Sequence, residues 1–486
     1  MKFENICTLA ARFTARHIIP CAIVMGVALA AAGWSETEYA FVVTTDFYSA
    51  AYYSTVEVLP PRTTDLNIGT VSTDPVVHYD VNEDMVFVIN RYLADNIQIV
   101  DPQSGFATVG QYSVGNGSNP HDIRLATSTK AYVSRFEWKT MLIVDPYSGD
   151  SLGVIDLSVF ADSDGIPEMD RMEIVGNRLF VALNCIDHTT WLPAGPGKVA
   201  VIDTEADTLV DCDPDVPGLQ PIVLPFPNPY SELRYDACWG KLIVGCLGAW
   251  GDLTGGVVAI DPVTLMADTV ATESQLGGDI SDVLLIPQGK GYAVVLDTLP
   301  WPDNYARLVA FDPVAGQVTD TLYAQTSGTG SSLATIEANR QGEVYLCDRD
   351  LTQPGLRIYD VRSDTLITKI DVGLPPFDLE FIQVPWAQVE VPSRGGEGDL
   401  LVQPNPTGAV THILLRGAEL SGSANLKIYD VEGRLIRNLV ADVARGKACI
   451  SWDLTDNHGS AVSPGIYYAT LIGDGYQVTR PIVVLR

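Results

Sequence analysis

One short motif recurs along the chain and limits how it can fold. It is an alternating apolar run that ends in an aspartate and a turn, as in residues 141–149 (MLIVDPYSG). The aspartate returns at intervals of roughly 40 to 60 residues, which is the spacing of a repeat architecture. The six motif aspartates are Asp101, Asp145, Asp203, Asp261, Asp312 and Asp360.

Each motif lies within a unit of four short apolar runs. Around Asp145, runs at residues 121–126 and 130–133 precede the motif and a run at 151–157 follows it. Four short strands in about 50 residues, separated by turn residues, are typical of a propeller blade. Because each blade buries its faces against its neighbours, the units share a continuous core.

Both ends of the repeat region supply parts of a seventh unit. Residues 39–45, 55–59 and 65–71 are predicted to be a blade without its first strand, and residues 376–382 a lone first strand. Pairing 376–382 with 39–45 closes the ring and leaves no exposed edge. We therefore expect a seven-bladed β-propeller over residues 38–384.

Runs such as residues 96–102 (NIQIVDP) and 119–122 (NPHD) resemble the seven-bladed propellers named for the YVTN repeat. The family includes bacterial exported proteins and archaeal surface-layer proteins, and the resemblance covers about residues 38–384. The YVTN tetrapeptide itself is absent, and residues 86–90 (VFVIN) and 131–134 (AYVS) stand in its place. The resemblance implies a fold and hardly an activity, because one fold hosts many functions.

Residues 1–32 have the features of a secretory signal peptide. Basic residues precede an apolar run at 21–32, which suits the core of a signal peptide and is short for a bilayer span. The alternative is an uncleaved anchor. No later segment is apolar enough to span a membrane, so we expect a secreted protein, extracellular or at the cell surface, with the periplasm as the alternative.

The formal net charge of −30 at pH 7 restricts the partners. Nucleic acids and anionic membranes are polyanions, so such a chain is repelled by both. The expected partners are an extracellular protein, peptide or glycan. No cysteine pair has the C-x-x-C spacing of a zinc or redox motif, and export permits disulfides. Cys185 with Cys212 is the better candidate pair, ahead of Cys238 with Cys246.

A second all-β unit is predicted at residues 399–486, after a linker at 385–398 that is rich in Pro, Gly and Ser. Residues 426–434 (LKIYDVEGR) and 464–468 (PGIYY) resemble the immunoglobulin-like domain of flagellar hook-capping proteins, and the related C-terminal sorting domains of type IX secretion cargo. The resemblance implies a small β-sandwich that contacts secretion machinery. The chain lacks the lysine-rich close of many sorting domains, so a plain structural module is the alternative.

Aligned blades place carboxylates on the innermost strands, which line the central channel of a propeller. A ring of carboxylates near the channel mouth could hold Ca²⁺ or a cationic ligand, partly compensated by Arg124 and Arg234. Alternatively, each carboxylate caps backbone amides of a neighbouring blade. The predicted ring is Asp122, Asp170, Glu232, Asp282 and Asp378.

Large aromatic residues recur in the loops after the second strands, on the same face as the channel mouth. Such a rim would suit the stacking of sugars or the binding of a peptide. Alternatively, each ring packs under its own loop. The five residues are Tyr92, Trp138, Trp191, Trp250 and Trp301.

Two acidic segments, residues 162–168 (DSDGIPE) and 211–215 (DCDPD), resemble fragments of calcium loops. The first segment lacks a full set of calcium ligands, and the second lacks the glycine of an EF-hand loop, so solvated acidic turns are the alternative. The weak Ca²⁺ candidates are Asp162, Asp164, Asp211, Asp213 and Asp215.

The motifs of serine hydrolases, zinc proteases and P-loop enzymes are absent, so we favour a non-enzymatic protein without a cofactor. In this hypothesis, the propeller face binds an extracellular ligand or acts as a scaffold, and the tail aids display or secretion. Some propellers resembling this one act on lactones, and a lactonase-like hydrolase would use His121 as general base with Asp122 and Arg124. A purely structural envelope or surface-layer component is the third hypothesis.

Overall fold

The computed structural model describes most of the chain between residues 37 and 484. The described ranges are 37–286, 289–298, 305–325, 333–339, 341–350, 352–384, 399–403, 411–416, 422–431, 433–443, 447–473 and 476–484. The predicted signal peptide, the predicted linker and Trp301 lie outside these ranges. Within them, no helix has both the length and the apolar character needed to cross a membrane.

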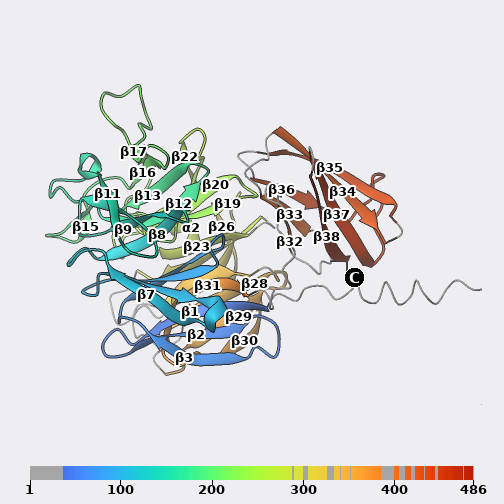
Figure 1. Ribbon diagram of the computed structural model, residues 1–486, viewed down its shortest axis with the longest axis horizontal. Helices are drawn as coiled ribbons and strands as arrows, with labels where there is room; N and C mark the ends of the chain where they lie inside the picture. Colours follow the sequence, from blue (N-terminus) through green and yellow to red (C-terminus); the bar gives the residue numbers. More distant parts are fainter. Residues whose placement is uncertain are drawn as a thin grey trace, which may run out of the picture.

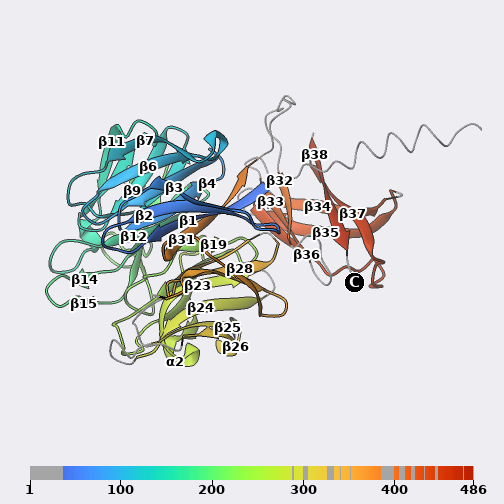
Figure 2. The same cartoon turned by 90° about the horizontal axis from the view of Figure 1, so that it is seen from below.

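The described residues form a ring of seven sheets, which carries a small two-stranded sheet of β14 (Ile186–Asp187) and β15 (Leu192–Pro193), followed by a smaller pair of sheets (Figures 1 and 2). Six sheets of the ring are consecutive in the chain, each beginning with its innermost strand. Three of them are β4 (Pro75–Asp80), β5 (Met85–Asn90), β6 (Asn96–Asp101) and β7 (Ala107–Ser113); β8 (Pro120–Thr127), β9 (Lys130–Arg135), β10 (Thr140–Val144) and β11 (Ser151–Asp156); and β12 (Met169–Val175), β13 (Arg178–Leu183), β16 (Lys198–Asp203) and β17 (Thr208–Leu209) with β18 (Ile222–Val223). The others are β19 (Arg234–Asp236), β20 (Lys241–Cys246), β21 (Gly256–Ile260) and β22 (Ala267–Thr272); β23 (Asp279–Ile286), β24 (Lys290–Leu296), β25 (Ala306–Asp312) and β26 (Gln317–Ala324); and β27 (Leu333–Ala338), β28 (Glu343–Asp348), β29 (Gly355–Asp360) and β30 (Thr365–Ile370).

The seventh sheet is built from both ends of the repeat region, as predicted. Its order is β31 (Pro376–Val384), β1 (Thr37–Thr45), β2 (Ala51–Glu57) and β3 (Thr64–Thr70). Tyr39 lies opposite Ile382 in an antiparallel ladder, and the two strands lie side by side in Figure 2. The inner strands β31, β4, β8, β12, β19, β23 and β27 each contact the next, and β27 contacts β31 again. The seven-bladed propeller is therefore closed.

The recurring aspartate has a local structural role that explains its repetition. In the turn after β10, Asp145 Oδ1 accepts hydrogen bonds from the backbone amides of Tyr147 at 3.0 Å and Ser148 at 2.9 Å. A short carboxylate that caps its own turn ends a strand and fixes the next hairpin. The same kind of cap is made by Asp101, Asp203, Asp261, Asp312 and Asp360.

The tail forms a two-sheet sandwich beside the propeller (Figure 1). One sheet contains β32 (Asp399–Gln403), β33 (Thr411–Arg416) and β36 (Lys447–Trp452); the other contains β34 (Gly422–Asp430), β35 (Leu435–Val443), β37 (Gly465–Gly473) and β38 (Tyr476–Val484). Trp452 is fully buried in their shared core, and its indole Nε1–H donates to the carbonyl of Thr455 at 2.9 Å. The large apolar side chain thus fills the core while its one polar group is satisfied.

The proposed pairing of Cys185 with Cys212 is wrong, because both are free thiols. Cys185 is buried in the apolar cluster under β12 and β13, whereas Cys212 packs on a different cluster that includes Ile222 and Leu224. Cys246 is also free, and Cys238 is disulfide-bonded.

Closure of the ring by β31 gives a test of stability. Ile382 is fully buried at the closing ladder, so Ile382→Ala should lower the free energy of unfolding by about 2 to 5 kcal/mol. The matched change Ile367→Ala, on outer strand β30 at a residue that is 45% exposed, should cost less than about 1 kcal/mol. Urea unfolding followed by circular dichroism measures both, and equal losses would contradict a closing role for β31.

Candidate functional site

Two cavities lie along the channel enclosed by the seven inner strands. The mouth cavity, of about 380 Å³, lies at the starts of the inner strands and the ends of the second strands. The inner cavity, of about 330 Å³, is lined by later residues of the inner strands. Glu232 and Thr335 line both cavities, so the two adjoin along the channel. Their volumes are at the lower end of the range for small-ligand sites.

Irregular pairing at the inner strands determines which side chains face the channel. The register of β8, β12 and β23 against their second strands shifts by a residue close to Asp122, Asp170 and Asp282, and β27 has a similar shift. A bulge of this kind redirects side chains and is frequent beside functional sites. It allows neighbouring residues such as His121 and Asp122 to make contacts in different directions.

Three of the predicted carboxylates link one blade to the next. Asp122 Oδ2 accepts a hydrogen bond from the Met172 amide at 2.7 Å, and Asp282 Oδ2 accepts one from the Ile336 amide at 2.9 Å. Asp378 completes the set with the Val77 amide at 3.0 Å. Each acceptor is at least 95% buried. For these three residues, the observed contacts are those of the alternative in which each carboxylate caps a backbone amide of a neighbouring blade.

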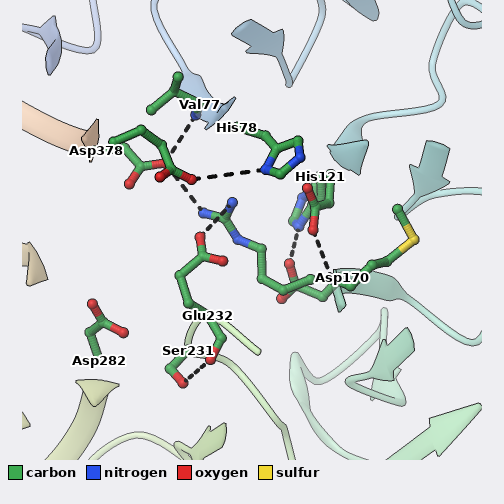
Figure 3. A network of polar contacts seen from close by, with 12 residues as sticks. Val77, His78, His121, Asp170, Ser231, Glu232, Asp282 and Asp378 are labelled. Carbon is green, nitrogen blue, oxygen red and sulfur yellow. Dashed lines mark hydrogen bonds and ion pairs between the residues drawn. The ribbon is translucent and has the colours of Figure 1, made fainter. Parts of the chain in front are cut away.

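The other two predicted carboxylates, Asp170 and Glu232, make different contacts, and Asp170 also lies one residue away from the equivalent position. In β12 the residue before the capped amide is Arg171, and Asp170 precedes it by one residue. Asp170 contacts His121 Nδ1 at 2.7 Å, and it accepts a hydrogen bond from Asn184 at 3.1 Å. The five carboxylates therefore do not form a ring of equivalent residues, although Figure 3 shows Asp170, Glu232 and Asp378 facing the same space.

Arginines balance much of the negative charge in the channel. Arg124 donates to Asp122 at 2.6 Å, and Arg234 contacts Asp282 at 2.8 Å, as the sequence indicates. Arg171 contacts Glu232 at 2.7 Å. Arg234 also holds Glu337 at 3.0 Å, although burial raises the pKa of that carboxyl group to about 7. Because the acids are paired, the channel is a network of buried ion pairs rather than a simple anionic ring.

The mouth cavity contains arginine and phenylalanine residues that the sequence analysis missed. The Arg349 guanidinium lies 4.2 Å from the ring centre of Phe47 and 5.3 Å from that of Phe377. Arg91 lies 5.4 Å from the Phe377 ring and 2.6 Å from Asp74. Their place in the sequence could have indicated these two arginines, because Arg91 and Arg349 directly follow the second strands of their blades.

Arg349 also connects the mouth cavity to the closure of the ring. It donates hydrogen bonds to the carbonyls of Thr45, at the end of β1, and of Pro375 and Pro376, at the start of β31. Burial lowers the pKa of this guanidinium to about 10. The group still carries its charge at neutral pH.

The predicted aromatic rim is only partly assembled around the cavity. Trp250 lines the mouth cavity, is 56% exposed, and makes an edge contact with Tyr230 at 6.0 Å between ring centres. Tyr92 and Trp191 are exposed but do not line it. Trp138 packs against Arg135 and lies so close to Gly115, in the loop between β7 and β8, that a side chain at position 115 would clash.

The residues proposed for lactone hydrolysis do not meet in one cavity. His121 lines the mouth cavity, Arg124 lines the inner cavity, and Asp122 is fully buried between blades. The carboxylate beside His121 is instead Asp170. Burial lowers the pKa of His121 against the attraction of Asp170, which favours the neutral imidazole.

The two acidic segments differ in their surroundings. Asp211 and Asp213 each accept a backbone hydrogen bond at 3.3 Å within their own turn, from Asp213 and Asp215. Asp164 lies near Glu168 and His188. Within the described ranges, only these last three form a group of His, Cys, Asp or Glu that could hold a metal ion.

No family model matches the sequence, and no curated protein is similar to it in sequence. A putative 6-phosphogluconolactonase from Bacteroides fragilis has a similar structure, with a TM-score of 0.51 and 14% identity over 72% of this chain and 98% of that chain. Apo AztD from Citrobacter koseri has a TM-score of 0.46 and 10% identity over 72% of this chain and 100% of that chain. PorZ, a surface component of the type-IX secretion system of Porphyromonas gingivalis, has a TM-score of 0.40 and 11% identity over 90% of this chain and 64% of that chain. At such identities, the similarity to the first protein supports the β-propeller fold alone.

The interblade caps give a second test of stability. Asp282→Ala leaves the buried Ile336 amide without its acceptor and removes one of the two carboxylates paired with Arg234, so it should lower the free energy of unfolding by about 3 to 5 kcal/mol. Asp320→Ala, on an exposed face of β26, should cost less than about 1 kcal/mol. Urea unfolding measures both variants, and a mild effect of Asp282→Ala would contradict the structural role.

Proposed function

We propose that the protein is an exported, non-enzymatic binding protein whose mouth cavity takes a small extracellular ligand, such as a sugar or a peptide side chain. The observation that carries the proposal is the half-exposed Trp250, set with Tyr230 at the wall of a 380 Å³ cavity. Exposed aromatic rings in a concave site provide apolar contact area with little loss of side-chain freedom.

The polar residues of the cavity restrict the class of ligand. Arg91 and Asp74 form an ion pair at its wall, His121 contacts Asp170 there, and Arg349 adds a positive charge. Both hydrogen-bond donors and acceptors therefore lie beside the aromatic faces. This combination suits a neutral or zwitterionic polar ligand better than a bare cation, which the paired carboxylates would bind weakly.

The tail sandwich belongs to the proposal as an aid to display or secretion, with a location outside the cytoplasm or at the cell surface. The resemblance to sorting domains motivates this role. Comparing export of the full chain with a chain that ends at Val384 tests it, and equal export would leave the tail as a structural module.

Arrays of glycans and peptides probed with the purified full chain test the binding function. Trp250→Ala should weaken binding of any positive ligand by about tenfold or more, because it removes the exposed wall of the cavity. Trp191→Ala is the matched control, since Trp191 is similarly exposed but lies outside the cavity. Calorimetry measures both. Unchanged binding in both variants would remove the aromatic residues from the site, and no ligand at all would favour a purely structural component.

Hydrolysis is the second candidate function, supported by the 2.7 Å contact between His121 Nδ1 and Asp170 in the mouth cavity. A neutral imidazole oriented by a carboxylate can act as a general base toward water. If the protein hydrolyses lactones, His121→Asn should reduce turnover by about 100-fold or more, whereas His458→Asn in the tail should not. A lactone panel assayed with and without chelator measures this, and absence of turnover in the unaltered protein would end the hypothesis.

A further inference from the structure

Two loops on the mouth side of one blade bring three metal-binding side chains together. Asp164 and Glu168 lie between η2 (Ser158–Phe160) and β12, and His188 follows the short strand β14 (Ile186–Asp187). Each side chain offers one ligand atom, and the three atoms lie within 4.8 Å of one another. His188 Nε2 is 3.4 Å from Glu168 Oε1, and His188 Nδ1 is 3.7 Å from Asp164 Oδ2. Because one ion binds only one nitrogen of an imidazole ring, the 3.4 Å pair of Glu168 Oε1 and His188 Nε2 has the spacing of two ligands about 2 Å from one ion, and Asp164 offers a third ligand oxygen in the same group.

Buried atoms without hydrogen bonds provide a second, independent observation. Glu168 is fully buried, and only its Oε2 is satisfied, by the Ile186 amide at 2.9 Å. Its Oε1 is buried with no hydrogen-bond partner, and the same is true of His188 Nε2. Asp162 Oδ2, in the same loop as Glu168, is a third such atom. Leaving a buried polar atom unpaired is unfavourable, whereas coordination to a cation would satisfy it.

The charge around these atoms is strongly negative. Glu137 Oε2 also lies 3.9 Å from His188 Nε2, which adds a carboxylate from the preceding blade. Among the described residues, no lysine or arginine forms an ion pair with Glu137, Asp162, Asp164 or Glu168. Carboxylates crowded in this way repel one another unless a cation lies between them.

We propose that Asp164, Glu168 and His188 bind a divalent transition-metal ion of the zinc type, with Glu137 placed to supply a further oxygen. An imidazole nitrogen suits Zn²⁺ and its neighbours in the first transition row, whereas Ca²⁺ and Mg²⁺ prefer ligand sets made only of oxygen. The segment 162–168 alone resembles part of a calcium loop. His188 adds an imidazole nitrogen from another loop, and this shifts the preference of the site from Ca²⁺ to an ion of the zinc type.

Binding would fix the loop that carries Trp191. The His188 ring stacks on the Trp191 ring, with centres 5.3 Å apart and an interplanar angle of 29°. A metal ion held by His188 would therefore connect the loop before β12 to the loop after β13 and hold Trp191 in place. This site is separate from the mouth cavity, so it stands whether or not the cavity binds a ligand.

Calorimetric titration of the chelator-treated full chain tests the proposal. One Zn²⁺ should bind per chain, and Glu168→Gln and His188→Asn should each weaken binding by about tenfold or more. Glu168→Gln keeps an amide oxygen for the Ile186 N–H, so the loop should remain folded. Asp211→Asn and His458→Asn are matched controls from the other acidic segment and from the tail, and neither should alter Zn²⁺ binding.

Trp191 provides a readout of where the ion binds. Zn²⁺ should change the tryptophan emission of the unaltered protein, and Trp191→Phe should remove that change while Zn²⁺ still binds. The proposal is overturned if no stoichiometric Zn²⁺ binds, if Ca²⁺ binds more tightly than Zn²⁺, or if binding survives both Glu168→Gln and His188→Asn, which would place the ion elsewhere.

Discussion

The ladder between β31 and β1 is the contact on which the rest of the structure depends. It joins the two ends of the repeat region, and Asp378 on β31 extends the connection to Val77, 301 residues away in the chain. Pairing of such distant strands carries a large cost in loop closure before its contacts form. Once formed, it gives the last blade its innermost strand and covers the edge of β1, and it allows inner strands from opposite sides of the ring to face one channel.

Ion pairs between charged residues of the inner strands determine the electrostatic character of the channel. Arg124, Arg171 and Arg234 neutralise acids from their own and neighbouring blades. Buried ion pairs add little net stability, but they are costly to break and therefore favour one arrangement of the blades. The formal net charge of −30 thus belongs mainly to other surfaces, and it does not by itself make the channel a site for cations.

The fold was predictable because its signals are local. An aspartate that caps its own turn repeats wherever a blade needs that turn, and the unmatched runs at 39–45 and 376–382 identify the closing strands. The site was less predictable. A bulge shifts register by one residue, which a period-two pattern does not reveal, so Asp170 was assigned to the position that Arg171 occupies. The direction of a loop side chain depends on local packing, as Trp138 beside Gly115 illustrates.

The metal-binding group shows a second limit of sequence reasoning. Residues 162–168 contain only part of a ligand set, and the missing nitrogen comes from His188 in a different loop of the same blade. Spacing along the chain gives no indication of that contact. It arises because the loop before an inner strand and the loop after the second strand lie on the same face of a propeller.

Arg349 connects the β31–β1 ladder, which closes the ring, to the wall of the mouth cavity. Its guanidinium binds the carbonyls at the junction of β1 and β31 and also packs on Phe47 and Phe377 in the cavity. A molecule seated against these rings would bind the closed ring and not the opened one. By mass action, its binding would stabilise the closed ring, and it would therefore also slow proteolysis at the junction of β1 and β31.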